Sequence, residues 1–206
     1  MSQDLFEIMR STRSMRRLKP DPIPDALLRQ VLEAGTCAAN GGNMQNWRFL
    51  AIRDPAIKAK AGEWYRKAWH EIVGPRYRAS QPAPGTTPER FARMLASAEY
   101  LAEHIHEAPM WIVPCAPGPR SAGSSVFPAV QNILLACRAL GLGCTLTTLH
   151  LNFEKDVEAA MGLPEDVHSY AILPIGYPMG KFGPVRRAPL ESVVYADRWG
   201  QALGAA

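Results

Sequence analysis

The chain has 206 residues, of which 47% are hydrophobic and 20% are charged. This balance predicts one globular domain over residues 1–206, and it excludes a disordered chain, a collagen-like repeat and a coiled coil. Lys and Arg outnumber Asp and Glu by 23 to 19, a net charge of +4 that favours an anionic partner.

The first third of the chain predicts three helices and one strand. Residues 4–11 can form a short helix, and residues 12–23 form a basic connector that contains prolines. Pro24 opens a helix whose apolar residues recur at spacings of three and four, and Gly35 ends it. The next predicted segments are a loop rich in Asn and Gly over 36–46, a strand over 48–53 and a helix over 55–73.

The middle of the chain contains a proline-rich segment. Residues 74–88 hold four prolines, a composition that predicts a mobile excursion or lid without a regular element. A helix is predicted over 88–107. Residues 110–115 form an apolar strand that Pro114 is expected to confine to a sheet edge or a bulge.

The last third begins with the strongest helix signal, over 124–140, with Gly141 as its C-cap. The further predicted elements are a strand over 144–149, a helix capped by Asn152 that runs through Met161, and a strand over 169–176. The tail, 177–206, holds only a short strand-like piece at 193–195, and we expect it to wrap as a C-terminal arm. Helices outnumber strands without strict alternation, so the fold class is α+β.

The sequence shows no pattern typical of a membrane span, a secretory signal or a metal site. The longest uncharged stretches, 121–137 and 139–153, are shorter than the roughly 18 apolar residues of a membrane span, so no membrane partner is expected. Residues 1–10 lack the apolar core of a secretory signal, and four widely spaced cysteines suit reduced, mostly buried thiols, so we expect a cytoplasmic location. The five histidines form no ligand cluster beyond His104 and His106, and no metal site is expected.

Two basic clusters are candidates for binding an anion. Arg13, Ser14 and Arg16 place two guanidinium groups and a hydroxyl around one turn, which suits phosphate because Arg can bind it with two parallel hydrogen bonds. A solvated basic surface is the other interpretation. Arg186 and Arg187 form a second cluster, which could complete the same anion site or bind a second molecule.

Residues 40–46 contain four carboxamide side chains and two glycines between a predicted helix and a predicted strand. A polar turn is one interpretation, since Asn and Gly readily adopt left-handed backbone. Recognition of a heteroaromatic ring is the other, because a carboxamide offers both donors and an acceptor to a ring edge of carbonyl and N–H groups. The glycines would then let the backbone approach a flat ligand.

Together these segments resemble the nitroreductase family of FMN-dependent oxidoreductases, and the resemblance covers nearly the whole chain. The segments that carry it are two N-terminal signatures (RSMRRLKPDPIP at 13–24 and NGGNMQNWRF at 40–49), a central helix (131–143), a last core strand (175–178) and a tail (187–194).

The resemblance implies a mixed, mainly antiparallel sheet sandwiched by helices, and an intertwined homodimer with one FMN in each of two interface sites. It assigns the phosphate and ribityl oxygens of FMN to Arg13, Ser14 and Arg16, and Arg187 adds to the phosphate site. The other FMN-binding positions that it implies are Asn40, from the opposite subunit in many members, Asn43, Gln45, Thr147, Thr148 and Leu149.

The resemblance also implies an activity. A flavin carries the redox chemistry itself, so no catalytic side chain is expected. We expect a ping-pong cycle in which NADH or NADPH reduces FMN, after which a small electron-poor acceptor such as a nitroaromatic or a quinone is reduced.

Other functions stay open. Within the same fold, the protein could be a reductive dehalogenase or a flavin-fragmenting synthase. A flavin-binding or anion-binding module without turnover is a second alternative. Nucleic-acid binding through residues 10–19 is a third, but it needs aromatic platforms or a basic stripe that the sequence lacks near this cluster, so no nucleic-acid partner is expected.

Overall fold

The computed structural model describes residues 4–83 and 85–203; Pro84 of the expected excursion and both chain ends, 1–3 and 204–206, lie outside the described residues. Its centre is a five-stranded sheet with antiparallel pairings, in the order β1-β2-β5-β3, and β4 also pairs with β2. The strands are β1 (Arg48–Ile52), β2 (Met110–Pro117), β3 (Gly143–Cys144), β4 (Val167–Ser169) and β5 (Leu173–Gly176).

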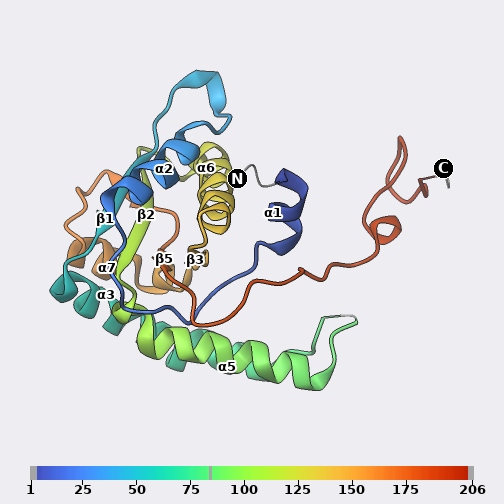
Figure 1. Ribbon diagram of the computed structural model, residues 1–206, viewed down its shortest axis with the longest axis horizontal. Coiled ribbons are helices and arrows are strands. Elements are labelled where there is room, and N and C mark those ends of the chain that lie inside the picture. Colours follow the sequence, from blue (N-terminus) through green and yellow to red (C-terminus); the bar gives the residue numbers. More distant parts are fainter. Residues whose placement is uncertain (1–3, 84, 204–206) are drawn as a thin grey trace.

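Helices cover both faces of this sheet (Figure 1). They are α1 (Leu5–Ser11), α2 (Asp25–Thr36), α3 (Pro55–Ala68), α4 (Gly74–Ala79), α5 (Pro88–His104), α6 (Gly123–Ala139) and α7 (Glu154–Ala160). On one face, Val31 of α2 and Ile133 of α6 pack in a buried cluster with Ile112 of β2. On the other face, Tyr65 of α3 packs with Trp111 of β2 in a second cluster, to which α5 and α7 also contribute. The expected α+β sandwich is confirmed.

β2 is the central strand, so of the two outcomes expected for Pro114 the sheet edge was wrong. The bulge is present: between the pairs Ile112↔Leu173 and Cys115↔Ser169, two residues of β2 face three of the neighbouring segment. β1 lies on one side of β2, and β5 and β4 lie on the other. The carbonyl oxygen of Pro114 accepts a 2.9 Å hydrogen bond from the amide of Tyr170, between the segments that pair with β5 and β4. The amide and carbonyl of one strand residue point the same way, so the missing amide hydrogen of Pro114 falls at this junction, where no ladder bond needs it.

Two glycines near helix ends have different roles. Gly141 ends α6 as predicted: its φ is 75°, and the amide of Leu142 donates to the carbonyl of Cys137 at 2.8 Å, as in a Schellman motif. Gly35 lies inside α2 instead of ending it. A Cβ at Gly35 would lie 2.9 Å from Cγ1 of Ile133, so this position lets α2 approach α6 closely.

Residues 74–79 form α4, so the expectation of an irregular segment over 74–88 was wrong for its first part. A π-helix, Trp69–Val73, continues α3 and leads directly into α4. The amide of Gly74 donates to the carbonyl of Trp69, and a Cβ at Gly74 would lie only 2.7 Å from that oxygen. Pro75 is tolerated because it falls in the first turn of α4. A lid function of the following residues stays a prediction.

The segments on either side of α7 differ from their prediction. The strand predicted over 144–149 is reduced to β3, and Leu149–Phe153 forms a 3₁₀ helix. Within this helix the side-chain Nδ2 of Asn152 donates to the carbonyl of Leu149 at 2.8 Å, so Asn152 does not cap α7. The strand predicted over 169–176 is divided between β4 and β5, because these two pair with different halves of β2.

The C-terminal tail runs along the domain up to Val185 and then leaves it, so that its red end in Figure 1 lies clear of both helix layers. The strand-like piece expected at 193–195 is not formed: Leu190–Ser192 is a 3₁₀ helix, and Tyr195 makes an isolated bridge with Ala202. Beyond Val185 the tail exposes the large apolar side chains of Leu190, Val193, Tyr195, Trp199 and Leu203. Wrapping around a second chain stays a prediction.

Candidate functional site

Backbone hydrogen bonds hold the basic connector on two sides. On one side, the amide of Met15 donates to the carbonyl of Cys144 in β3 at 3.0 Å. A Cβ at Gly143 would lie 3.0 Å from Cβ of Met15, so the connector rests directly on β3. On the other side, the tail runs antiparallel to the connector: the amide of Met179 donates to the carbonyl of Arg17 at 3.0 Å, and the amide of Val185 donates to the carbonyl of Arg10, in the last turn of α1, at 2.8 Å.

The pairing of connector and tail forms one wall of a basic pocket of about 730 Å³, and α5 forms another. Its lining residues are Arg13, Ser14 and Arg16 of the connector, Pro184, Val185, Arg186 and Arg187 of the tail, and Arg90, Arg93, Met94 and Ser97 of α5. We call it the arginine pocket. The four residues expected to bind phosphate (Arg13, Ser14, Arg16, Arg187) thus lie together, and their role stays a prediction.

The arginine pocket is strongly positive, because its lining contains six arginines and no carboxylate. In the described part of the chain, none of these six forms an ion pair with Asp or Glu. Burial lowers the pKa of the Arg16 guanidinium, although arginine stays protonated in proteins. Like charges repel each other in such a cleft, so the pocket is suited to attract an anion.

Thr147 is held by a hydrogen bond to Tyr65 of α3. The buried Thr147 hydroxyl and the Tyr65 hydroxyl form a 2.7 Å hydrogen bond. Burial raises the pKa of Tyr65 to about 12, and the nearby positive charge of Arg16 acts in the opposite direction. Thr148 is exposed and Leu149 is half-buried. Tyr65 thus binds Thr147 directly, whereas Arg16 acts on it only through its charge.

The carboxamide loop folds tightly on itself. Asn43 and Gln45 have left-handed backbone, with φ of 53° and 50°. The amide of Gln45 donates to Oδ1 of Asn40 at 2.9 Å, and Nε2 of Gln45 donates to Oδ1 of Asn43 at 3.3 Å. Non-glycine residues with positive φ are strained, and such strain concentrates at functional sites.

This loop does not reach the arginine pocket of the same chain. Asn40, Asn43 and Gln45 are absent from the pocket lining. In Figure 1 the light-blue loop lies beyond α2 and α6, whereas α5 lies on the opposite side of the sheet. The amide of Gly41 donates to Oγ of Ser125 at the start of α6, which holds the loop there. A single chain thus separates the two expected halves of the FMN site.

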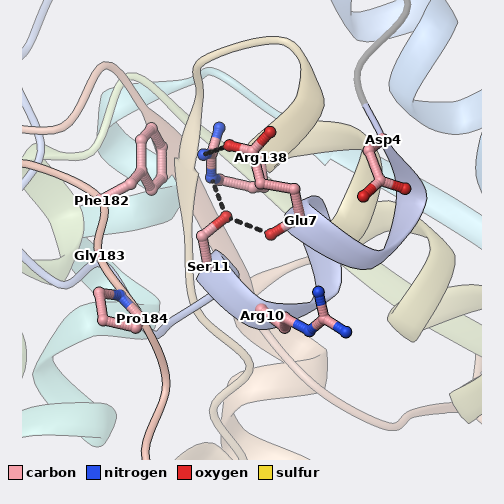
Figure 2. Close-up of a pocket in the computed structure, with 8 residues that line it drawn as sticks. All are labelled: Asp4, Glu7, Arg10, Ser11, Arg138, Phe182, Gly183 and Pro184. Carbon is pink, nitrogen blue, oxygen red and sulfur yellow. Dashed lines mark hydrogen bonds and ion pairs between the residues drawn. The ribbon is translucent and has the colours of Figure 1, made fainter.

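A second cavity, of about 520 Å³, is lined by α1, α6 and the tail (Figure 2). Nε of Arg138 donates to Oγ of Ser11 at 2.9 Å, and the guanidinium lies 3.7 Å from the carboxylate of Glu7. The same guanidinium lies 4.4 Å from the centre of the Phe182 ring. Arg138 thus ties α1 and the tail to α6, and unlike the arginine pocket this cavity contains carboxylates of its own, Asp4 and Glu7.

Three potential metal ligands lie together although the sequence predicted no such cluster. Atoms of Glu154, Glu158 and His168 lie within 4.8 Å of one another. However, Arg120 pairs with Glu154 and its guanidinium lies 4.0 Å from Glu158. Glu158 also accepts a 2.6 Å hydrogen bond from the amide of Ser169. The guanidinium is the cation of this cluster, which holds α7 against β4.

The contribution of α5 to the arginine pocket was not predicted from the sequence. Arg90, Arg93 and Ser97 follow one another at intervals of three and four, so their spacing alone places them on one helix face. No local signal shows that this face meets the connector. That contact depends on how α5 packs in the tertiary structure.

Comparisons with known proteins agree with this fold. A family model described as the nitroreductase family matches residues 9–177. An NADH dehydrogenase of Thermus thermophilus is 32% identical over 198 residues, 88% of this chain and 90% of the relative. An iodotyrosine deiodinase of Thermotoga neapolitana is 29% identical over 177 residues, 84% of this chain and 88% of the relative. A solved iodotyrosine deiodinase bound to FMN and 3-iodo-L-tyrosine superposes with a TM-score of 0.74 at 22% identity, over 95% of this chain and 99% of that chain. The chain belongs to the nitroreductase family.

Proposed function

We propose that the protein is an FMN-dependent oxidoreductase that takes electrons from NADH or NADPH and passes them to a small electron-poor acceptor. The observation that carries this proposal is the arginine pocket, where Arg13, Ser14 and Arg16 meet Arg187 from the other end of the chain. FMN in the solved deiodinase of the same fold supports it.

The donor set of the arginine pocket fits the phosphate of FMN. FMN ends in a phosphate monoester, which carries a charge of about −1.5 to −2 at neutral pH. Arg13, Arg16 and Arg187 offer guanidinium groups that can bind two phosphate oxygens each, and Ser14 offers a hydroxyl. FAD has no terminal monoester, so we expect FMN and not FAD.

The residues of this chain bind and orient the cofactor. FMN, when bound, supplies hydride chemistry at its N5 atom. Arg16 is partly buried, so its positive charge acts in a less polar environment than that of a surface arginine. The hydrogen bond between Tyr65 and Thr147 holds the start of the segment Thr147, Thr148 and Leu149, whose backbone groups would contact the flavin ring when FMN is bound.

A homodimer is part of the proposal, because one chain holds the carboxamide loop apart from the arginine pocket. A second copy can supply Asn40 and its neighbours to this pocket, and its surface can cover the apolar side chains of the tail, such as Trp199 at 90% exposure. A cytoplasmic location belongs to the same proposal, since Cys115, Cys137 and Cys144 are buried and free. Among the described residues, no helix has the length and apolar composition of a membrane span.

Reductive dehalogenation is a second candidate activity for the same site. The favouring observation is that iodotyrosine deiodinases are found both among the sequence relatives and among the solved structures of this fold. Both activities use the same FMN site, so the acceptor distinguishes them.

Cofactor identification and turnover test these proposals. Purified protein should be yellow and release FMN on denaturation, measured by chromatography against FMN and FAD standards. NADH or NADPH oxidation should increase when menadione is added. Release of iodide from 3-iodo-L-tyrosine under reducing, anaerobic conditions would assign the second activity. Bound FMN without any turnover indicates a binding module, and a colourless protein that takes up no added FMN contradicts the whole proposal.

A further inference from the structure

α5 places two arginines in the arginine pocket that the family resemblance does not assign. Arg90, Arg93, Met94 and Ser97 lie at intervals of three, one and three residues, and all four line the pocket. They therefore share one face of the helix, and that face looks toward the connector and the tail. Arg90 is half-buried and Arg93 is exposed, so both guanidinium groups are accessible to a ligand from solvent.

These two arginines lack the protein partners that a neighbouring arginine has. Arg78 of α4 lies 3.9 Å from the carboxylate of Glu99 on α5. Arg90 and Arg93 form no ion pair within 4–83 and 85–203. The pKa of the exposed Glu89 carboxylate is lowered mainly by hydrogen bonds at the start of α5, and to a smaller extent by the positive charges of Arg93 and Arg90. Glu89 does not line the pocket.

The pocket holds more positive charge than one phosphate monoester neutralises. Six arginines line it, whereas a monoester carries a charge of about −1.5 to −2. The expected phosphate site uses three of the six, namely Arg13, Arg16 and Arg187. Arg90 and Arg93 come from a different element and are not part of that expected phosphate site, so their guanidinium groups are available to a second anion.

We propose that Arg90 and Arg93 form a second phosphate site, which takes the 2′-phosphate of NADPH. This inference rests on the proposed function, in which a nicotinamide nucleotide is the electron donor. NADPH differs from NADH only by this monoester, the chemistry that paired guanidinium groups bind best. NADPH carries this phosphate on its adenosine ribose, at the far end from the nicotinamide that reduces FMN, so it needs an anion site separate from the one that holds the FMN phosphate. The α5 pair would make the enzyme prefer NADPH.

Steady-state kinetics with both donors and one acceptor test the assignment. We expect wild type to have a kcat/KM at least tenfold higher for NADPH than for NADH. Arg90→Gln and Arg93→Gln should each lower the ratio of the two kcat/KM values by about ten- to a hundredfold, as the loss of one charge-assisted hydrogen bond implies. Arg76→Gln, a matched change at an exposed arginine outside the pocket, should leave the ratio unchanged.

Calorimetric titration gives a readout that does not depend on turnover. 2′,5′-ADP carries the 2′-phosphate without the nicotinamide, and it should bind the FMN-loaded protein in competition with NADPH. 5′-AMP and inorganic phosphate distinguish a site for this nucleotide from a general anion site. The proposal is overturned if all three bind alike, or if Arg90→Gln and Arg93→Gln leave the binding of 2′,5′-ADP unchanged.

Measuring FMN binding by wild type and by both variants distinguishes a failure of this inference from a failure of the proposed function. If both variants lose FMN while the NADPH to NADH ratio stays constant, α5 belongs to the cofactor phosphate and the inference fails although the proposed function stands. If wild type binds no FMN, the proposed function fails. In that case, binding of 2′,5′-ADP that depends on Arg90 and Arg93 would still support the second site, and its absence would overturn it.

Discussion

The amide of Val185 donates a 2.8 Å hydrogen bond to the carbonyl oxygen of Arg10, and this bond joins the tail to the last turn of α1, directly before the basic connector. The two residues lie 175 positions apart in the chain. The two residues after Val185 are Arg186 and Arg187, which line the same pocket as Arg13. A backbone pairing thus brings the second basic cluster to the first.

Replacement of Arg16 tests whether the arginine pocket binds the cofactor. Arg16→Ala should weaken FMN binding by about ten- to a hundredfold, because a charge-assisted hydrogen bond is worth about 1.5–3 kcal/mol. Fluorescence titration of the flavin-free protein measures the affinity. Arg29→Ala, at an exposed arginine of α2 outside the pocket, is the control. Unchanged affinity in Arg16→Ala would identify the basic connector as an ordinary solvated surface.

Removal of the tail tests the dimer. We expect the intact chain to be an obligate dimer, since obligate interfaces often bury more than about 2,000 Å² and the tail exposes several large apolar side chains. A chain that ends at Arg186 should lose both the dimer and FMN, as measured by light scattering and absorbance. Arg187→Ala in the full chain should weaken FMN binding and keep the dimer. A folded, FMN-loaded monomer in either form would refute the shared site.

Tyr65→Phe tests the link between α3 and the Thr147 turn. This change removes one partner of a buried 2.7 Å hydrogen bond and leaves the Thr147 hydroxyl without it. The free energy of unfolding should fall by about 1–3 kcal/mol, which chemical denaturation measures. Tyr77→Phe, at a tyrosine that is 42% exposed, should change it by much less. Equal effects of the two changes would show that the hydroxyl pair contributes nothing specific.

Because His150 is buried, we expect the free energy of unfolding to fall in acid. Burial, with a smaller effect of the positive Arg120, lowers the pKa of His150 to about 3. An unfolded chain has a histidine pKa near 6.5, so between about pH 6.5 and 3 the unfolded state binds one more proton. The free energy of unfolding therefore falls as the pH is lowered through this range, by up to about 1.4 kcal/mol per pH unit from this residue.

Denaturation at pH 6.5 and pH 5 isolates the contribution of His150, because most carboxylates titrate below this range. His150→Gln should reduce the loss of stability between the two pH values, whatever its effect on absolute stability. His106→Gln changes an exposed histidine that forms no ion pair among the described residues, and it should keep the wild-type loss. A wild-type pH dependence in His150→Gln would contradict the assignment.

Local signals in the sequence determined much of this fold. The apolar spacing of α2 and α6 and the left-handed Gly141 are set by residues close in the chain, so they could be predicted. The two candidate anion-binding clusters, at 13–16 and at 186–187, could also be found from the sequence. The ability of Arg and Ser side chains to bind an anion depends on the residue type and not on the fold.

Only the tertiary structure decided which of these segments lie next to one another. Pro114 is tolerated in the central strand because its missing amide falls between two partner strands, which no local pattern shows. Arg90 and Arg93 belong to the arginine pocket because α5 packs beside the connector, and a helix face by itself does not reveal what it faces. Conversely, Asn43 lies away from Arg16 because Ser125 holds the carboxamide loop at the start of α6. Such distances are set by packing between residues far apart in the chain. The sequence gives residue types and their spacing, but it does not show which residues become neighbours when the chain folds.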